Sequence, residues 1–322
     1  MKIKAILTVL LLLIISLNFF GCNDKNHPPI CCTTPPPPSI SQTISTVKYG
    51  VVEVAIAGSR GSGVIIDKVD GSLKILTNLH IIRSFNTTPS NVQIRFYTSS
   101  NFVYAPVIGY ALNYDLAVIS APYIPSNYHI FEFNYEIYQT QKVFALGYLV
   151  SLGTNTPIGT FTVLDGLISA TETNFLALNR NFYAISSTAP IRGGISGGAL
   201  IDIYGRLVGI PSWGYIHNGV VMPFGISYNI PALIASAIFD RVIISDQQMA
   251  HLNLGFFINN DGRVHLILTN FSNVYIRQYV NGFYKYNQGV RTRIEKVNGY
   301  QIESMSMLLA QIIRTLNNIR FN

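Results

Sequence analysis

The sequence predicts an all-β protein of antiparallel barrels or sandwiched sheets, with a small α+β region at its C-terminal end. Short apolar runs rich in Val, Ile and Tyr recur from residue 47 to about residue 231, separated by Gly, Asn, Asp and Pro, with no segment of helical periodicity among them. That pattern is typical of barrels and sandwiches. The dipeptide Asp70-Gly71 is a strong hairpin signal, and it predicts that residues 64–67 pair with residues 73–77.

The composition indicates a folded protein with a sizeable core. Of the 322 residues, 49% are hydrophobic and only 11% are charged, which suits one large domain and a smaller one. The net charge of +7 is spread along the chain without a run of Lys or Arg. A solvated basic surface explains this charge better than a nucleic-acid site does, so we expect no nucleic-acid partner.

The N-terminal segment predicts export. Lys2 and Lys4 precede an uncharged apolar run over residues 5–20, which is short for a membrane-spanning helix of about 20 residues. The following "LNFFGC" resembles the lipobox of bacterial lipoproteins, which implies cleavage after residue 21 and lipidation of Cys22. The alternative is an uncleaved anchor. In both cases we expect the protein in the bacterial cell envelope, periplasmic or on the outer surface, and held to a membrane.

All three cysteines, Cys22, Cys31 and Cys32, precede the β-rich region. We therefore expect no disulfide in the core. The last two adjoin "TTPPPPS", and a run of prolines forms a stiff extended spacer. We interpret residues 1–21 as a signal peptide and residues 22–45 as a tether. The alternative, a ligand for a proline-reading domain, is disfavoured outside the cytoplasm.

The stretch "IRGGISGGALID" surrounds Ser196 with four glycines. Either this is a tight turn between strands, or it is a strained turn that exposes a nucleophile and aims the N–H groups of Gly194 and Ser196 at an oxyanion. Two further signals favour the second explanation. His80 ends a predicted strand in "ILTNLHII", and Asp115 begins another in "YDLAVIS". The chain order His, Asp, Ser recurs in enzymes that use these three groups together.

These motifs together resemble the trypsin-like serine proteases, and among them the bacterial HtrA (Deg) group. The resemblance rests on "SGVIID", "LTNLH", "YDLAVIS", "GGISGGALID" and "GRLVGI", with "SWG" at residues 212–214 and "GISYNIP" at residues 225–231. It covers about residues 46–240 and implies two six-stranded antiparallel barrels with the active site between them.

The resemblance also implies the roles of the site residues. Ser196 would be the nucleophile, His80 its general base and Asp115 the carboxylate that orients the histidine, with Ser212 supporting Asp115. The implied function is a serine endopeptidase that cleaves unfolded or extended polypeptides. This chemistry needs no metal and no organic cofactor. The alternative is a non-catalytic chaperone-like or peptide-binding lipoprotein on the same fold, and the resemblance leaves a homo-oligomer open.

Specificity is expected to follow from the pocket that the resemblance implies. No acidic residue lies among its expected walls, so we expect cleavage after Val, Ala, Ile or Leu rather than after Arg or Lys. The sequence departs from the HtrA pattern at residues 192–195, where Asn-Pro-Gly-Asn is usual, and at Thr188, where Asp is usual. The expected pocket residues are Pro190, Ile191, Ser212, Trp213, Gly214 and residues 226–229, including Ile226 and Asn229.

Residues 246–322 carry a weaker signal. The stretch "LNLGFFI" resembles the carboxylate-binding loop of PDZ domains at Leu254, Gly255 and Phe256. The stretch "RIEKVNGYQIESMSMLLAQIIRTL" resembles the strand, Asn-Gly turn, strand and helix that end such domains. The resemblance implies a domain that adds a peptide as an extra strand. The alternative is a structural α+β appendage without a ligand.

Overall fold

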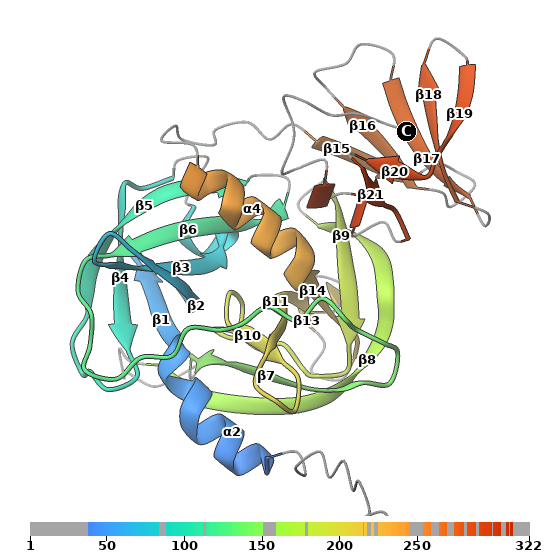
Figure 1. Ribbon diagram of the computed structural model, residues 1–322. Coiled ribbons are helices and arrows are strands. Elements are labelled where there is room, and N and C mark those ends of the chain that lie inside the picture. The colour runs from blue at the N-terminus through green and yellow to red at the C-terminus, as the bar shows by residue number, and fades with distance from the viewer. Residues whose placement is uncertain are drawn as a thin grey trace, which may run out of the picture. The chain divides into compact units, whose positions relative to one another are not determined.

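Two closed antiparallel barrels follow one another along the chain in the computed structural model (Figure 1). Each has six strands, which confirms the predicted fold class. The first runs in the order β1-β2-β3-β6-β5-β4 and the second in the order β10-β11-β14-β9-β8-β7. The residues described by the structure are 38–83, 88–111, 114–150, 159–177, 180–214, 216–217, 220–221, 225–244, 254–258, 264–268, 274–279, 282–287, 290–297, 299–303, 307–308 and 310–311. The predicted signal peptide and all three cysteines lie outside them.

The strands of the first barrel are β1 (Val51–Ile56), β2 (Ser59–Val69), β3 (Ser72–Asn78), β4 (Asn91–Phe96), β5 (Val103–Ala111) and β6 (Leu116–Ala121). Those of the second are β7 (Lys142–Leu149), β8 (Thr160–Ala177), β9 (Arg180–Ser187), β10 (Ala199–Ile201), β11 (Leu207–Gly214) and β14 (Ser227–Pro231). Between the last two lie the short β12 (Ile216–His217) and β13 (Val220–Val221), which pair with each other.

The predicted hairpin joins β2 and β3. Asp70 and Gly71 have φ values of +50° and +72°, and two positive φ values are those of a type I′ turn, whose twist suits a hairpin. The observed register pairs Val64 with Leu76 and Val69 with Ser72. The predicted pairing of these two segments is therefore confirmed.

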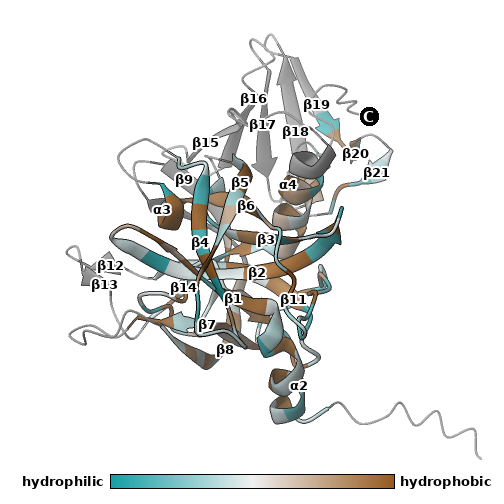
Figure 2. Ribbon diagram, turned by 90° about the vertical axis from the view of Figure 1, so that its left-hand side faces the viewer, coloured by the Kyte–Doolittle hydropathy of each residue, from teal (hydrophilic) through white to brown (hydrophobic). Residues whose placement is uncertain are grey.

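Hydrophobic side chains fill each barrel and the space between the barrels. Strand β6 is buried at all six positions, and Figure 2 shows hydrophobic residues along much of the strands of both barrels. Helix α4 (Ala232–Ile244) contacts strands β5 and β6 of the first barrel and β11 and β14 of the second. Its buried Ile234 and Ile238 share one core cluster with Val118 of the first barrel and Leu207 of the second. This packing holds the two barrels together.

One prediction about the start of the fold is wrong. Helix α2 (Ile40–Val47) occupies residues that we assigned in part to the tether of residues 22–45, so the tether ends earlier. A capping box explains the helix, because the Ser39 hydroxyl accepts from the Gln42 N–H and the Gln42 side chain accepts from the Ser39 N–H. The Thr43 hydroxyl also donates to the Ile203 carbonyl of the second barrel at 3.0 Å.

The other short helices are the 3₁₀ helix η1 (Lys48–Gly50) and α3 (Leu79–Ile82). Within the described residues, no helix combines the length and the apolar character that crossing a membrane requires.

The C-terminal region contains a five-stranded antiparallel sheet whose strands are neighbours in chain order. The predicted loop at Leu254, Gly255 and Phe256 is instead part of an edge strand, because these residues pair with Leu268, Ile267 and Leu266. The two predicted strands that flank the Asn-Gly pair are present as β20 (Lys296–Val297) and β21 (Tyr300–Gln301), and the residue between Val297 and Gly299 lies outside the described residues. The strands are β15 (Leu254–Ile258), β16 (Val264–Leu268), β17 (Val274–Tyr279), β18 (Gly282–Asn287), β19 (Val290–Ile294), β20 (Lys296–Val297) and β21 (Tyr300–Gln301).

Candidate active site

The pairing of strands β3 and β6 brings His80 to Asp115. These strands are antiparallel neighbours, with Asn78 opposite Leu116, so the end of one lies beside the start of the other. The His80 Nδ1 atom lies 2.7 Å from Asp115 Oδ2, and the His80 backbone N–H donates to Asp115 Oδ1 at 2.8 Å. Both carboxylate oxygens therefore hold the histidine, and the ring keeps Nε2 for other partners.

Asp115 is held from several sides. The Ser212 hydroxyl donates to its Oδ2 atom at 2.7 Å, which is the support we expected from Ser212. The Asp115 carbonyl accepts from the Leu79 N–H at 3.0 Å and from the Asn78 side-chain amide at 3.1 Å. Asp115 has φ +54°, a left-handed conformation that costs free energy and persists only where surrounding contacts enforce it. The sequence analysis did not identify Asn78, whose only signal was its place two residues before the histidine.

Ser196 belongs to the second barrel and lies next to Ser212. Its hydroxyl donates to the Ser212 carbonyl at 3.0 Å in this structure. The indole ring of Trp213 lies against the His80 imidazole, with ring centroids 4.7 Å apart and an angle of 38° between the planes. Ser212 therefore contacts both the carboxylate and the serine, and the Ser196 hydroxyl must rotate away from the Ser212 carbonyl to reach His80.

Residues Arg192–Ile195, where the sequence departs from the HtrA pattern, form a closed turn. The Ile195 N–H donates to the Arg192 carbonyl at 3.0 Å, and Gly194, the third residue of the turn, has φ +101°. A positive φ at that position is the mark of a type II turn rather than type I. A side chain would not fit, because a Cβ on Gly194 would lie 2.1 Å from the Tyr148 carbonyl oxygen.

The turn also fixes the direction of the Gly194 N–H. The Gly193 carbonyl, which belongs to the same peptide group, accepts from the Val150 N–H at 3.0 Å. Because the C=O and N–H of a trans peptide point in opposite directions, the Gly194 N–H points away from Val150. In the part of the chain that the structure describes, neither this N–H nor that of Ser196 has a protein acceptor. Both donors are available to a substrate oxygen.

Ser62 connects the first barrel to this turn. Its buried hydroxyl donates to the Gly194 carbonyl at 2.7 Å and accepts from the Tyr148 N–H at 2.8 Å. Its backbone N–H donates to the Ser196 carbonyl at 2.8 Å. A serine between two glycines in "GSGVII" gave no separate signal in the sequence. We infer that Ser62 is a positioning residue for the turn.

We expect Ser62→Ala to lower kcat by about tenfold with little change in KM, since one hydrogen bond that holds the turn is lost. The variant leaves the buried Tyr148 N–H unsatisfied and also loses stability. Ser120→Ala is the matched control, because Ser120 is a buried serine that accepts from the Lys74 ammonium at 2.8 Å in the first barrel. Steady-state kinetics below both melting temperatures separate the two effects. An equal fall in kcat in both variants would contradict the positioning role.

The predicted specificity residues differ in how far they are buried. Ser212 and Asn229 are buried, Pro190, Trp213 and Gly214 are half-buried, and Ile226 is 44% exposed. The Asn229 amide donates to the Ser187 hydroxyl at 3.1 Å, so it is held inside the second barrel.

Two further observations bear on the chemistry. Burial raises the pKa of the Tyr148 phenol, and the nearby Arg95 guanidinium opposes that rise only in part, so this tyrosine stays neutral. Among the described residues, no three His, Cys, Asp or Glu side chains are grouped so that they could hold a metal ion.

The family model of the trypsin-like peptidase domain matches residues 61–210. Residues 61–210, which include most of both barrels, are thus similar to a trypsin-like peptidase domain. The two six-stranded barrels and the chain order of His80, Asp115 and Ser196 follow the pattern that the sequence resembled.

Relatives and a solved structure agree with this assignment. A probable periplasmic serine endoprotease, DegP-like, from Buchnera aphidicola is 30% identical over 53% of this chain and 35% of its own length. The protein of the same description from Chlamydia trachomatis is 27% identical over 77% of this chain and 48% of its own. The serine endoprotease from Yersinia pestis has 27% identity and a TM-score of 0.50, covering 66% of this chain and 69% of that one. The chain thus spans between a third and a half of these curated relatives.

Proposed function

We propose that the protein is an exported serine endopeptidase of the HtrA type that cleaves unfolded or extended polypeptides. The observation that carries this proposal is the Asp115 carboxylate, which binds His80 through both oxygens and Ser212 through one. A buried carboxylate with these partners is suited to orient an imidazole as a general base. Ser196 and two available N–H groups complete the arrangement.

The chemistry follows from these contacts. With Nδ1–H donated to Asp115, the neutral His80 ring accepts the Ser196 hydroxyl proton at Nε2 while Oγ attacks the substrate carbonyl. The Gly194 and Ser196 N–H groups stabilise the negative charge on the carbonyl oxygen. The imidazolium then gives its proton to the leaving amine, which breaks the C–N bond. Water repeats the sequence on the acyl-enzyme and restores Ser196.

The alternative from another class is a non-catalytic protein that holds unfolded chains in the same place. Such a protein has no use for the hydrogen bonds that hold His80 to Asp115, which is why we favour the enzyme. Peptide binding by residues 246–322 stays a prediction.

Mapping of cleavage sites in unfolded casein by mass spectrometry tests the proposed function. The expected pocket has no acidic residue, so an aliphatic side chain gains roughly 1.5–3 kcal/mol by burial while a buried Lys or Arg lacks a counter-charge. We expect most cuts after Val, Ala, Ile or Leu. A majority of cuts after basic residues would show that the pocket is assigned wrongly, and no cuts together with no fluorophosphonate labelling of Ser196 would overturn the enzyme.

The proposed location rests on the sequence and on the relatives, which are named periplasmic. Lipidation of Cys22 predicts that a fatty-acid probe labels the protein in cells and that Cys22→Ser abolishes the labelling. Cys31→Ser is the control that keeps it. Equal labelling of the two variants would exclude Cys22 as the lipidated residue.

A further inference from the structure

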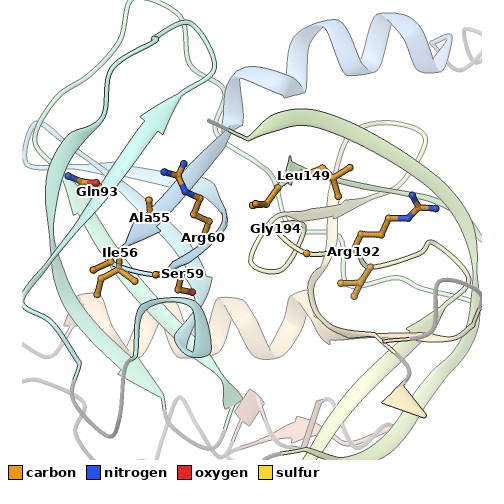
Figure 3. A pocket seen from close by; sticks show the side chains of 13 residues that line it. Ala55, Ile56, Ser59, Arg60, Gln93, Leu149, Arg192 and Gly194 are labelled. Atoms are coloured by element: carbon orange, nitrogen blue, oxygen red, sulfur yellow. The ribbon is translucent and has the colours of Figure 1, made fainter. Parts of the chain in front are cut away.

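A cavity of about 1140 Å³ opens beside the turn that carries Gly194 (Figure 3). One wall is the end of β1 and the start of β2, from Ala55 to Arg60, and the other is formed by Leu149, Val150 and residues 191–194. None of the described residues that line it belongs to residues 212–214 or 226–229. Of the residues expected to form the pocket for the side chain before the cleaved bond, Ile191 alone also lines the cavity. The cavity therefore borders that pocket at Ile191 and otherwise lies apart from it.

The position of the cavity assigns it to the part of a substrate that follows the cleaved bond. The resemblance to trypsin-like proteases assigns residues 212–214 to the wall that takes the acyl side of a peptide whose carbonyl oxygen accepts from the Gly194 and Ser196 N–H groups. The chain beyond the cleaved bond then leaves across Gly194, which lines the cavity. The segment released as the amine product is thus the part of the substrate that can occupy it.

Positive charge comes from both walls. Arg60 belongs to the β1–β2 wall and Arg192 to the turn before the nucleophile, and Figure 3 shows them on different sides of the cavity. Arg192 is exposed and has no acidic partner in the described part of the chain. No Asp or Glu is among the described residues that line the cavity.

The positive charge of Arg60 is not fully neutralised, although Arg60 contacts the Glu53 carboxylate. Its Nη1 atom donates to Glu53 Oε1 at 3.0 Å, but Arg95 contacts Glu53 Oε2 through Nε at 2.8 Å and through Nη2 at 2.6 Å. Two guanidinium groups thus share one carboxylate, which leaves one net positive charge. The Arg60 side chain is 29% exposed and that of Arg95 only 8%, so the excess charge faces solvent at Arg60.

We propose that this cavity binds a carboxylate on the leaving segment of the substrate, and that Arg60 and Arg192 make the enzyme prefer acidic leaving segments. Guanidinium groups bind carboxylates by charge-assisted hydrogen bonds. The carboxylate can be an acidic side chain or the C-terminal α-carboxylate of a short leaving segment, since both present the same group. The apolar residues Ile56, Leu149 and Val150 give the segment a hydrophobic surface. This inference rests on the proposed function.

Quenched fluorescent peptides test it with the purified full chain. All share one acyl side and carry Glu, Gln or Lys at each of the first three leaving positions in turn, with the C-terminus either amidated or free. We expect Glu to exceed Gln by about fivefold in kcat/KM at its best position, as for a partly exposed ion pair, and Lys to be the poorest. A fivefold gain from the free C-terminus alone, with no gain from Glu, would assign the site to the α-carboxylate.

The variants decide whether the arginines cause the preference. Arg192→Gln is expected to reduce the Glu-to-Gln ratio, and Arg60→Gln with Arg192→Gln is expected to bring it to about one. Arg293→Gln is the control, because Arg293 is exposed and lies outside the cavity lining, and it should keep the wild-type ratio. High salt should weaken the preference, since the screening length falls to about 3 Å at 1 M. Equal rates for Glu and Gln together with no gain from the free C-terminus, or a carboxylate preference that survives in the double variant, would overturn the inference.

A binding measurement keeps this result separate from the proposed function. Fluorescence anisotropy of the same peptides with the Ser196→Ala variant reports on the cavity without any chemistry. If this variant binds the carboxylate peptides more tightly, and the two arginine changes abolish that difference, the carboxylate site is supported. This holds even if the wild-type protein cleaves nothing, because that result would overturn only the proposed enzymatic function. Equal binding of Glu and Gln peptides, with equal binding of amidated and free C-termini, overturns the cavity assignment whatever the activity.

Discussion

Ser196→Ala is expected to abolish casein cleavage and fluorophosphonate labelling while the protein stays folded. Loss of the nucleophile typically lowers kcat by about 10⁶-fold and leaves a residual rate of roughly 10³- to 10⁴-fold over water, from the oxyanion site and substrate binding. The free energy of unfolding should change by about 1 kcal/mol or less, because among the described residues the Ser196 hydroxyl makes one hydrogen bond, to the Ser212 carbonyl.

The measurement is casein cleavage with thermal unfolding on the same samples. Ser45→Ala is the control, since Ser45 is an exposed serine of α2 whose hydroxyl donates to the Gln42 carbonyl. We expect the control to keep full activity. Casein cleavage by Ser196→Ala at the wild-type rate would remove this serine from the proposed mechanism.

Asp115→Asn is expected to lower kcat by about 10⁴-fold, as when an orienting carboxylate is lost from such a site. Both oxygens of Asp115 now accept hydrogen bonds, one from the His80 N–H and one from the His80 ring and the Ser212 hydroxyl. An amide presents an NH₂ group to one of these sets of donors. If that group faces Nδ1, the ring must place its proton on Nε2, where it cannot accept the proton of Ser196.

Ser212→Ala is a milder change for comparison with Asp115→Asn. It removes one of the hydrogen bonds to Asp115 Oδ2 and leaves both His80 contacts in place, so we expect a fall in kcat of about tenfold. Steady-state kinetics on one fluorescent peptide measure both variants. A fall below tenfold for Asp115→Asn, in protein that unfolds at the wild-type temperature, would contradict the role of this carboxylate.

The departure from the HtrA pattern at residues 192–195 changes how the turn is supported, without removing its donors. The closed turn has the positive φ at Gly194 that a type II geometry requires. The Ser62 hydroxyl and the Val150 N–H hold the carbonyls of Gly194 and Gly193. Thr188, where the family has Asp, accepts from the Leu167 N–H at 2.9 Å instead. These contacts show how the turn at residues 192–195 is held, which the departure from the HtrA pattern had left undetermined.

The sequence by itself determined the fold class and the β2–β3 hairpin, and it predicted which residues bear the chemistry. Alternating apolar positions and turn residues act over a few neighbours, so a single strand or a type I′ turn at Asp70-Gly71 is specified locally. It did not reveal α2, because eight residues beside a proline run are too few for a helical period to emerge, and the Ser39–Gln42 capping box was overlooked.

Only the tertiary structure decided how those residues are held. Asn78 and Ser62 reach their partners across barrel strands or between the barrels, at chain separations that no local pattern records. The same holds for the cavity, whose walls bring residues 55–60 against residues 191–194. The contact of Ser212 with Asp115 was expected through the family resemblance alone. Strand pairing and barrel packing bring distant segments together through side-chain fit, which depends on the whole core at once. Hydrogen bonds that cross between such segments therefore become visible only when the chain is folded.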